Sequence, residues 1–217
     1  MDSSVADKWR TCAVDYVDWW RTTDRQLIRS FSNQVTCTIL ADMASPNKYR
    51  VARTVPGYGE QKYKFIVDWL NSVRSLDLDR ETVPRMIGQA CIDLGERYGK
   101  YLPSILSKAL WMVKGHPVVI YDSLAWEGLR RGGFSPGYQG YVRYFAAWFK
   151  FYDSEETQAN LEHAVSSLVT SGTLGNSEFE ELSVAGRLKN RIADVWLWKV
   201  GESARAKTKV RGFGSWR

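Results

Sequence analysis

Histidine and cysteine are scarce in this chain, which has two His and three Cys among its 217 residues. Cys12, Cys37 and Cys91 lie far apart and form no Cys-x-x-Cys pair, so we expect neither a disulfide framework nor a zinc site. His116 and His163 add too few ligands for a metal centre built from histidine and cysteine. The sequence therefore indicates a protein of a reducing compartment that uses no metal and no other cofactor.

Long apolar runs are also missing from the chain. No segment approaches the roughly 20 apolar residues that a membrane-spanning helix needs. The first ten residues, MDSSVADKWR, contain no apolar signal-peptide core. We therefore expect a soluble, cytoplasmic protein with no membrane partner.

The chain has an excess of positive charge and many aromatic residues. Its net charge is +6, and it contains ten Trp, eleven Tyr and eight Phe. Basic residues are concentrated near the end of the sequence, at Lys199, Arg205, Lys207, Lys209, Arg211 and Arg217. A solvated tail and an arm that contacts phosphates are both consistent with this segment, and both interpretations remain open.

The spacing of apolar residues predicts an all-α fold, since most segments have helical rather than alternating periodicity. Predicted helices cover residues 5–31, 62–76, 83–98, 102–115, 121–131, 142–152, 154–170 and 177–201. Residues 49–55, YRVARTV, are the best candidate for a strand.

Residues with known preferences for helix ends mark several boundaries. Predicted N-terminal caps are Asp79 or Thr82, Asp122 or Ser123, Ser154, and a capping box of Ser177 with Glu180. Predicted C-terminal caps are Gly99 and Gly115.

Lys108 and Asp122 lie at opposite ends of a mainly apolar segment. A helix, a break at His116-Pro117 and an extended return separate them. This geometry can bring an amine and a carboxylate to one cleft. Alternatively, Lys108 points to solvent, and Asp122 is a helix cap without any further role.

The same segment resembles the helix-hairpin-helix DNA glycosylase superfamily, in particular its branch similar to 8-oxoguanine DNA glycosylase. In that superfamily a hairpin of the form Leu-Pro-Gly-hydrophobic-Gly-x-Lys precedes a helix, and a catalytic aspartate follows an apolar run. In LPSILSKAL and VVIYDS, the residues that match are Leu102, Pro103, Ile105, Lys108 and Asp122. The chain is also similar to compact prokaryotic glycosylases, some of them associated with anti-phage defence.

The resemblance covers about residues 95–201 and includes the closing helix RIADVWLWKVG. Ser104 and Leu106 replace the two hairpin glycines, and the interval from lysine to aspartate is shorter than in better-known members. The resemblance implies a two-lobed helical fold with a cleft between the lobes. One lobe would hold about residues 1–80 with the C-terminal helices, the other about 81–150, and residues 202–217 would form a basic tail of this single domain.

The resemblance implies catalytic roles for Asp122 and Lys108 in cleaving the bond between a base and its sugar. The carboxylate would stabilise the positive charge that develops on the deoxyribose. The lysine would attack the sugar and give lyase activity, or it would bind phosphate while water attacks.

A glycosylase must also flip its base into a pocket with aromatic or apolar walls. The candidate substrate-binding residues are Trp111, Phe134, Tyr138 and Tyr141, although burial in a core would explain them equally well. The candidate DNA-binding residues are Ser104, Ser107, Arg130, Arg131, Lys207 and Arg211.

We therefore expect a monomeric DNA glycosylase that acts on double-stranded DNA in the cytoplasm of a prokaryotic cell, at the nucleoid. The excised base would be an oxidised guanine or a hypermodified phage base such as glucosylated hydroxymethylcytosine. A catalytically inactive helix-hairpin-helix module that binds DNA for a partner enzyme is the alternative. An all-α interaction protein is a third possibility.

Overall fold

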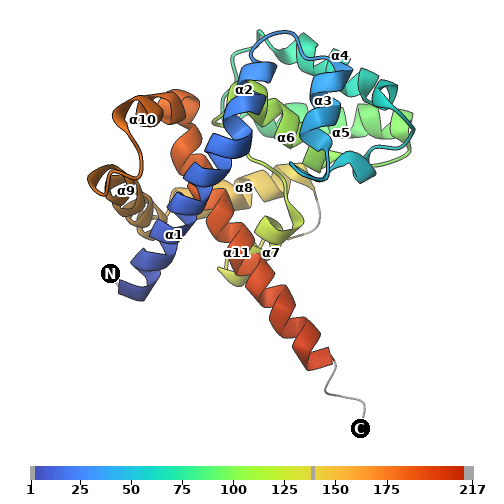
Figure 1. Ribbon diagram of the computed structural model, residues 1–217. Coiled ribbons are helices and arrows are strands. Elements are labelled where there is room, and N and C mark those ends of the chain that lie inside the picture. The colour runs from blue at the N-terminus through green and yellow to red at the C-terminus, as the bar shows by residue number, and fades with distance from the viewer. Residues whose placement is uncertain (1–2, 138–139, 213–217) are drawn as a thin grey trace. The chain divides into compact units, whose positions relative to one another are not determined.

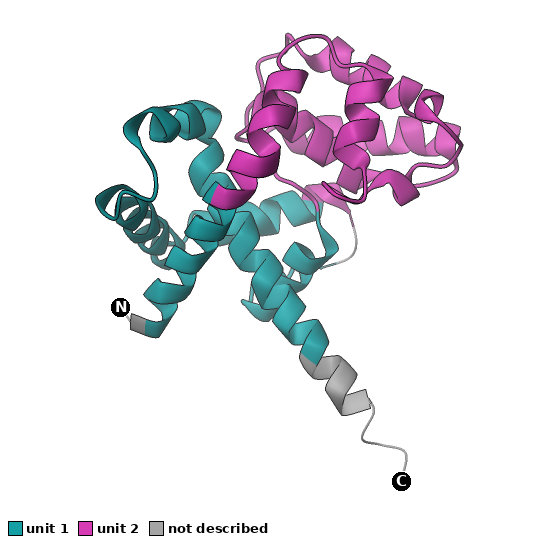
Figure 2. Cartoon of the chain, in the orientation of Figure 1, with its two compact units in different colours: residues 1–17, 122–139, 143–217 teal, residues 18–121, 140–142 magenta. Residues whose placement is uncertain are grey.

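The computed structural model describes residues 3–137 and 140–212, and these residues form helices and connecting loops with no β-strand among them (Figure 1). The predicted all-α class is therefore confirmed. The chain divides into two compact units (Figure 2). Unit 2 comprises residues 18–121 and 140–142, and unit 1 holds the described parts of residues 1–17, 122–139 and 143–217.

This division differs from the lobes expected from the sequence. Residues 18–80 and 81–121 belong to one unit, whereas the family resemblance implied separate lobes for them. Residues 3–17 fall in the unit that also holds the C-terminal helices.

Unit 2 is built around its last helix. Its elements are the end of α1 (Ser3–Trp19), a π-helical turn η1 (Trp20–Asp24), α2 (Arg25–Phe31), α3 (Cys37–Ala44), the 3₁₀ turns η2 (Ala52–Thr54) and η3 (Glu60–Tyr63), α4 (Lys64–Val73), α5 (Thr82–Tyr98) and α6 (Pro103–Lys114). Helix α6 packs against α2, α3, α4 and α5. Nine of the 12 residues of α6 are buried as a result, which is typical of a helix in the middle of a bundle.

Unit 1 has an aromatic core and a close helix pair. Its elements are α1 up to Val17, α7 (Ser123–Arg131), most of α8 (Tyr141–Tyr152), α9 (Glu155–Thr170), α10 (Asn176–Ser183), the 3₁₀ turn η4 (Val184–Gly186) and α11 (Arg187–Gly212). Trp9 stacks on Trp196 with ring centroids 4.4 Å apart, and Phe151 lies on the Trp9 ring at 6.3 Å. These stacked rings join α1, α8 and α11.

Most of the predicted helix ends are confirmed. The side chain of Asp122 accepts a hydrogen bond from the N–H of Leu124, and that of Ser154 accepts one from Thr157. Asp79 Oδ1 accepts the N–H groups of Glu81 and Thr82 just before α5. At the other ends, Gly99 and Gly115 adopt positive φ angles of 62° and 71°, which glycine adopts without strain.

Two predictions about secondary structure are wrong. The candidate strand at residues 49–55 contains the 3₁₀ turn η2, preceded by Arg50 with a φ of 55°. The single helix predicted at 177–201 is interrupted, because Ala185 and Gly186 adopt φ angles of 54° and 61° between α10 and α11.

The ends of these two helices also differ from expectation. Helix α10 begins after Gly175, whose N–H donates to Glu178, so the capping box of Ser177 with Glu180 is not formed. Residues 202–212, expected as a separate tail, continue α11.

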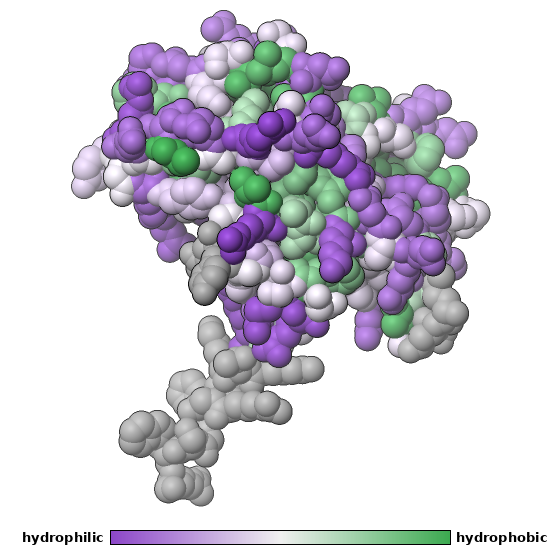
Figure 3. Space-filling model, turned by 180° about the vertical axis from the view of Figure 1, so that it is seen from behind, coloured by the Kyte–Doolittle hydropathy of each residue, from purple (hydrophilic) through white to green (hydrophobic). Residues whose placement is uncertain are grey.

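Apolar side chains at the surface are dispersed along the sequence. On the face seen in Figure 3, hydrophilic residues cover most of the surface, with apolar residues between them. The large apolar residues with the greatest exposure are Tyr58, Phe65, Leu76, Ile92, Tyr101, Val142, Val169, Val184 and Trp198. None of the helices in the described ranges combines the length and apolar character required to cross a bilayer.

Candidate functional site

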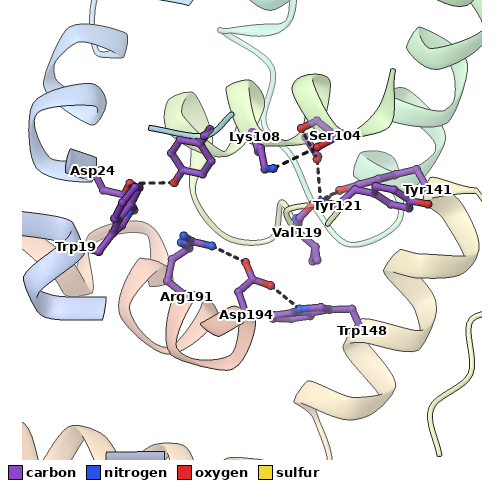
Figure 4. A network of polar contacts seen from close by, with 12 residues as sticks. Trp19, Asp24, Ser104, Lys108, Val119, Tyr121, Tyr141, Trp148, Arg191 and Asp194 are labelled. Atoms are coloured by element: carbon purple, nitrogen blue, oxygen red, sulfur yellow. Dashed lines mark hydrogen bonds and ion pairs between the residues drawn. The ribbon is translucent and has the colours of Figure 1, made fainter. Parts of the chain in front are cut away.

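Lys108 is a buried lysine in the centre of unit 2. It lies on α6 and is only 6% exposed. Its Nζ donates a hydrogen bond to Ser104 Oγ at 3.2 Å and lies 5.7 Å from the centroid of the Tyr49 ring (Figure 4). Because removing an ammonium group from water is costly, these polar and aromatic neighbours are needed to hold the amine there.

A buried carboxylate, that of Asp24, contacts the hydroxyl group of Tyr49. Asp24 is fully buried, and its Oδ1 accepts hydrogen bonds from Tyr49 Oη and Trp19 Nε1, each at 2.9 Å (Figure 4). Unit 2 thus contains a chain of contacts from the Lys108 amine through an aromatic ring to a carboxylate. Asp24 was not among the site residues predicted from the sequence, although it lies at helical spacing from the buried residues Trp20 and Leu27.

From Pro103 onward, the segment that resembles a glycosylase hairpin is part of helix α6. A turn at residues 99–102 joins α5 to α6, and Pro103 occupies the first helical position. Ser104 and Leu106 continue the helix, because neither supplies the conformational freedom of the glycines that it replaces.

Ser107 has a structural role and not the predicted contact with DNA. It is fully buried, and its Oγ accepts the N–H of Tyr121 at 2.9 Å while donating to the Ser104 carbonyl at 3.3 Å. A hydroxyl held in this way ties α6 to the extended return and cannot extend to a phosphate. Ser104 is half-buried and is the hydrogen-bond acceptor of Lys108.

Asp122 opens α7 in unit 1. Its backbone is extended, its side chain is half-buried, and Oδ1 accepts the Leu124 N–H at 2.8 Å. The carboxylate therefore lies at the positive end of a helix dipole, where negative charge is stabilised. Lys108 belongs to unit 2 and Asp122 to unit 1.

A second carboxylate of unit 1, Asp194 on α11, is buried and belongs to a polar network. It accepts hydrogen bonds from Trp148 Nε1 at 2.9 Å and from Arg191 Nη1 at 3.0 Å (Figure 4). Burial raises the pKa of Asp194 to about 6, against the opposing effect of Arg191, and the negative charge of Asp122 raises it further. Asp194 was not among the predicted site residues either, although the segment RIADVWLW places an acid three residues after Arg191 in a mainly apolar helix.

Two glycines fix α7, and with it Asp122, against α11. A Cβ atom on Gly128 would lie 2.1 Å from the Leu197 carbonyl oxygen, and one on Gly201 would lie 2.0 Å from that of Leu124. No side chain fits in either place. The two backbones are in direct contact, which holds the N-terminus of α7 in a defined position.

Arg130 and Arg131, predicted to bind DNA, both pair with Glu127 on the same helix. Arg130 donates to both Glu127 oxygens at 2.7 and 2.9 Å, and Arg131 Nε donates at 2.9 Å. The Arg130 contact, followed by that of Arg131, lowers the pKa of Glu127 to about 2. Both arginines are exposed, so they remain available to solvent while forming this cluster.

The predicted aromatic pocket is not assembled as expected. Trp111 and Tyr141 are fully buried in unit 2, and Tyr141 Oη donates to the Val119 carbonyl at 2.9 Å (Figure 4). These two residues pack the core, since neither ring is accessible to a flipped base. Phe134, in unit 1, is half-buried and packs edge-on against Phe151 with centroids 5.5 Å apart.

The remaining predicted positions fall at the limits of the described chain. Tyr138 lies outside the described residues, as do the side chains of Lys207 and Arg211. Among the side chains that are described, no group of three His, Cys, Asp or Glu residues is close enough to hold a metal ion.

No family model matches the chain, and neither the curated proteins nor the solved structures contain a significant match to it.

Proposed function

We propose that this protein is a DNA glycosylase that removes a modified base from double-stranded DNA, with Lys108 and Asp122 as catalytic residues. The burial of Lys108 is the observation that carries the proposal. Lysine is almost never found fully buried, and an apolar residue of similar size would fill the same place with equal or greater stability. A lysine in the centre of a helical bundle is therefore a candidate for chemistry.

The chemistry of excision suits an amine and a carboxylate. As the bond between C1′ and the base nitrogen breaks, the electron pair leaves with the base, which takes up a proton, and positive charge develops on the sugar. The Asp122 carboxylate would stabilise this charge. Lys108, as a neutral amine, would bond to C1′ and form a Schiff base after ring opening, and strand cleavage would follow. If water attacks instead, the product is an intact strand with an abasic site.

Two classes of base are candidates for excision. Oxidised guanine follows from the 8-oxoguanine DNA glycosylase branch that the sequence resembles. Glucosylated hydroxymethylcytosine follows from the resemblance to glycosylases of anti-phage defence. Gly132, Gly133, Gly137 and Gly140 precede α8 and carry no side chains, so they would permit a roomy pocket for a bulky base, which favours the second class.

An inactive DNA-binding module is the second candidate function. The hydrogen bond from Leu124 to Asp122 favours it, because a helix cap explains the aspartate without any catalysis. The same protein would then bind DNA for a separate enzyme.

The first experiment compares wild type with Asp122→Asn and Lys108→Gln. Asparagine is as good an N-cap as aspartate, so Asp122→Asn keeps α7 intact while removing the charge. Each protein is incubated with DNA containing 8-oxoguanine, with phage DNA containing glucosylated hydroxymethylcytosine and with unmodified DNA, and aldehyde-reactive abasic sites are counted. Asp7→Asn and Lys64→Gln remove the same charges from exposed positions and serve as controls.

The glycosylase proposal requires abasic sites with wild type and both controls, and their loss with Asp122→Asn. A covalent complex trapped by borohydride in wild type, and absent in Lys108→Gln, would identify the lysine as nucleophile. Abasic sites made by Lys108→Gln without the trapped complex would assign the attack to water. DNA binding without abasic sites on any substrate would favour the inactive module.

A further inference from the structure

Unit 1 contains a groove lined by α1, α11 and the last residue of α7. Its volume is about 860 Å³, which lies within the range typical of ligand sites in proteins. All of its lining residues belong to unit 1. We call it the tryptophan groove, after a lining that combines apolar side chains with three cations and includes Lys8, Cys12, Arg131, Trp196, Lys199 and Val200.

Trp196 ends a row of stacked aromatic rings. Its ring lies nearly parallel to that of Trp9, at an interplanar angle of 8°, and Trp9 in turn lies at 13° to Phe151. Trp9 is buried, whereas Trp196 is half-buried and lines the groove. Among the residues that the structure describes, Trp9 is the only aromatic ring that contacts Trp196. A planar ring bound in the groove can therefore continue the row.

The three cations give the groove an excess of positive charge. Lys8 is exposed and forms no ion pair within the described ranges. Lys199 pairs with Asp15, and Arg131 pairs with Glu127, which a second arginine also contacts. Lys199, Asp15 and Arg131 retain between 36% and 51% of their side-chain exposure, and ion pairs at such sites contribute little and can be exchanged for another anion.

The apolar part of the groove carries no charge of its own. Burial raises the pKa of the Cys12 thiol to about 11, against the opposing effect of Lys199, so the thiol stays protonated at neutral pH. Val200 and the Trp196 ring are half-buried beside it. The groove thus offers a flat apolar surface and cations to one ligand.

We propose that the tryptophan groove binds a nucleotide, with the base stacked on Trp196 and the phosphate held by Lys8, Arg131 and Lys199. Every base has a face that stacks on an aromatic side chain, and lysine and arginine are the usual partners of phosphate. A purely apolar ligand would leave the cations without a role, and a simple anion would leave the ring without one. A free nucleotide and a nucleotide of an unpaired DNA strand share this chemistry.

Nucleotide binding in this groove goes beyond the proposed excision of a base and does not depend on it. Neither Lys108 nor Asp122 lines the groove. Arg131, expected from the sequence to bind DNA, does line it.

The test is the binding of four ligands to the full chain, measured by isothermal titration calorimetry. The first is deoxyadenosine monophosphate. Deoxyadenosine lacks its phosphate, and deoxyribose 5-phosphate lacks its base. The fourth ligand is a short single strand of oligodeoxyadenylate, which distinguishes a strand from a free nucleotide as the source.

Two variants remove the two halves of the proposed site. Trp196→Leu removes the stacking surface, and Lys8→Gln removes one charge. Trp198→Leu and Lys150→Gln make the same changes at exposed positions of unit 1 that do not line the groove, and they serve as controls. Thermal unfolding confirms that each variant is folded. Should Trp196→Leu not fold, Ser203→Glu replaces it, because it places a negative charge at an exposed lining position.

We expect wild type to bind the nucleotide more tightly than either of its fragments. Trp196→Leu should weaken nucleotide binding by at least about fivefold, the lower end of what base stacking contributes. Lys8→Gln should weaken it by about two- to fivefold, and added salt should reduce this difference. Ser203→Glu should weaken binding of the nucleotide but not of deoxyadenosine. Both controls should keep the wild-type affinity.

The two sources of the nucleotide give different results. A strand that binds more tightly than the mononucleotide would assign the groove to an unpaired strand. A strand that binds no more tightly would assign it to a free nucleotide.

Three results would overturn the inference. In the first, neither the nucleotide nor the strand binds to wild type. In the second, Trp196→Leu, or Ser203→Glu in its place, binds the nucleotide as well as wild type does. In the third, deoxyribose 5-phosphate binds as tightly as the nucleotide, because the ring would then have no part in binding.

Counting abasic sites separates this inference from the proposed function. If wild type makes no abasic sites but binds the nucleotide through Trp196, the glycosylase proposal fails and the groove remains a nucleotide site. If abasic sites form and the nucleotide does not bind, the inference fails and the enzyme remains.

Discussion

Replacing Gly201 by alanine should separate α7 from α11 and destabilise unit 1. The new Cβ would lie 2.0 Å from the carbonyl oxygen of Leu124, and ordinary contacts of this kind begin at 3.4 Å. The two helices must therefore move apart by about 1.4 Å, the difference between these distances. Since the clashing atom belongs to the backbone, no side-chain rotation can relieve the contact.

The expected cost follows from two opposing effects. Overpacking a well-packed contact typically costs about 1–3 kcal/mol, and a clash with backbone belongs at the upper end of that range. Alanine in place of glycine inside a helix stabilises the folded state by about 1 kcal/mol, because alanine has the higher helix propensity. The net loss is about 2 kcal/mol, which for a chain of this size lowers the melting temperature by about 4–8 °C.

Thermal unfolding followed by circular dichroism measures this change, and Gly95→Ala provides the control. Gly95 lies inside α5, and a Cβ there would meet its nearest atom, the Lys100 carbonyl oxygen, at an ordinary distance of 3.5 Å. Gly95→Ala should therefore raise the melting temperature slightly through helix propensity. A Gly201→Ala protein as stable as Gly95→Ala would refute the close contact between α7 and α11.

Two further predictions concern buried polar groups. Burial raises the pKa of Asp194 from 3.8 to about 6, so between about pH 4 and pH 6 the folded protein holds a proton that the unfolded chain has lost. The free energy of unfolding should therefore fall by about 3 kcal/mol as pH rises through that window. Urea unfolding at several pH values measures this fall, which should be absent in Asp194→Asn. Tyr141→Phe removes the buried hydrogen bond to the Val119 carbonyl and should lower the free energy of unfolding by about 1–3 kcal/mol in the same assay, while leaving the proposed glycosylase activity unchanged. Loss of the proposed activity with unchanged stability would instead indicate that Tyr141 contacts the substrate.

Local sequence signals predicted most of the helices and their ends. Asp122, Ser154, Gly99 and Gly115 mark boundaries that the structure confirms, because capping depends on hydrogen bonds within a few residues. The break at residues 184–186 was not predictable in the same way. Apolar spacing continues across it, and the positive φ angles of Ala185 and Gly186 in the structure reveal it.

The candidate site was predictable only in part. Lys108 and Asp122 were selected from motif spacing, but nothing local predicted that Lys108 is buried. Its burial results from the packing of α2, α3, α4 and α5 around α6, which joins segments distant in sequence. Asp24 and Asp194 were missed for the same reason, since an acid on a helix is usually exposed and tertiary contacts decide the exceptions.

The interleaving of the two units imposes an order on folding during synthesis. Residues 18–121 of unit 2 are nearly continuous in sequence, so most of that unit can fold soon after it leaves the ribosome. Unit 1 cannot, because α1 pairs with α11, and the ion pair between Asp15 and Lys199 joins residues 184 positions apart. At about 5–20 residues per second, α1 waits roughly 10–40 s for its partner. Throughout that interval Trp9 lacks the Trp196 ring on which it stacks, so the nascent chain exposes the apolar face of α1, to which chaperones can bind.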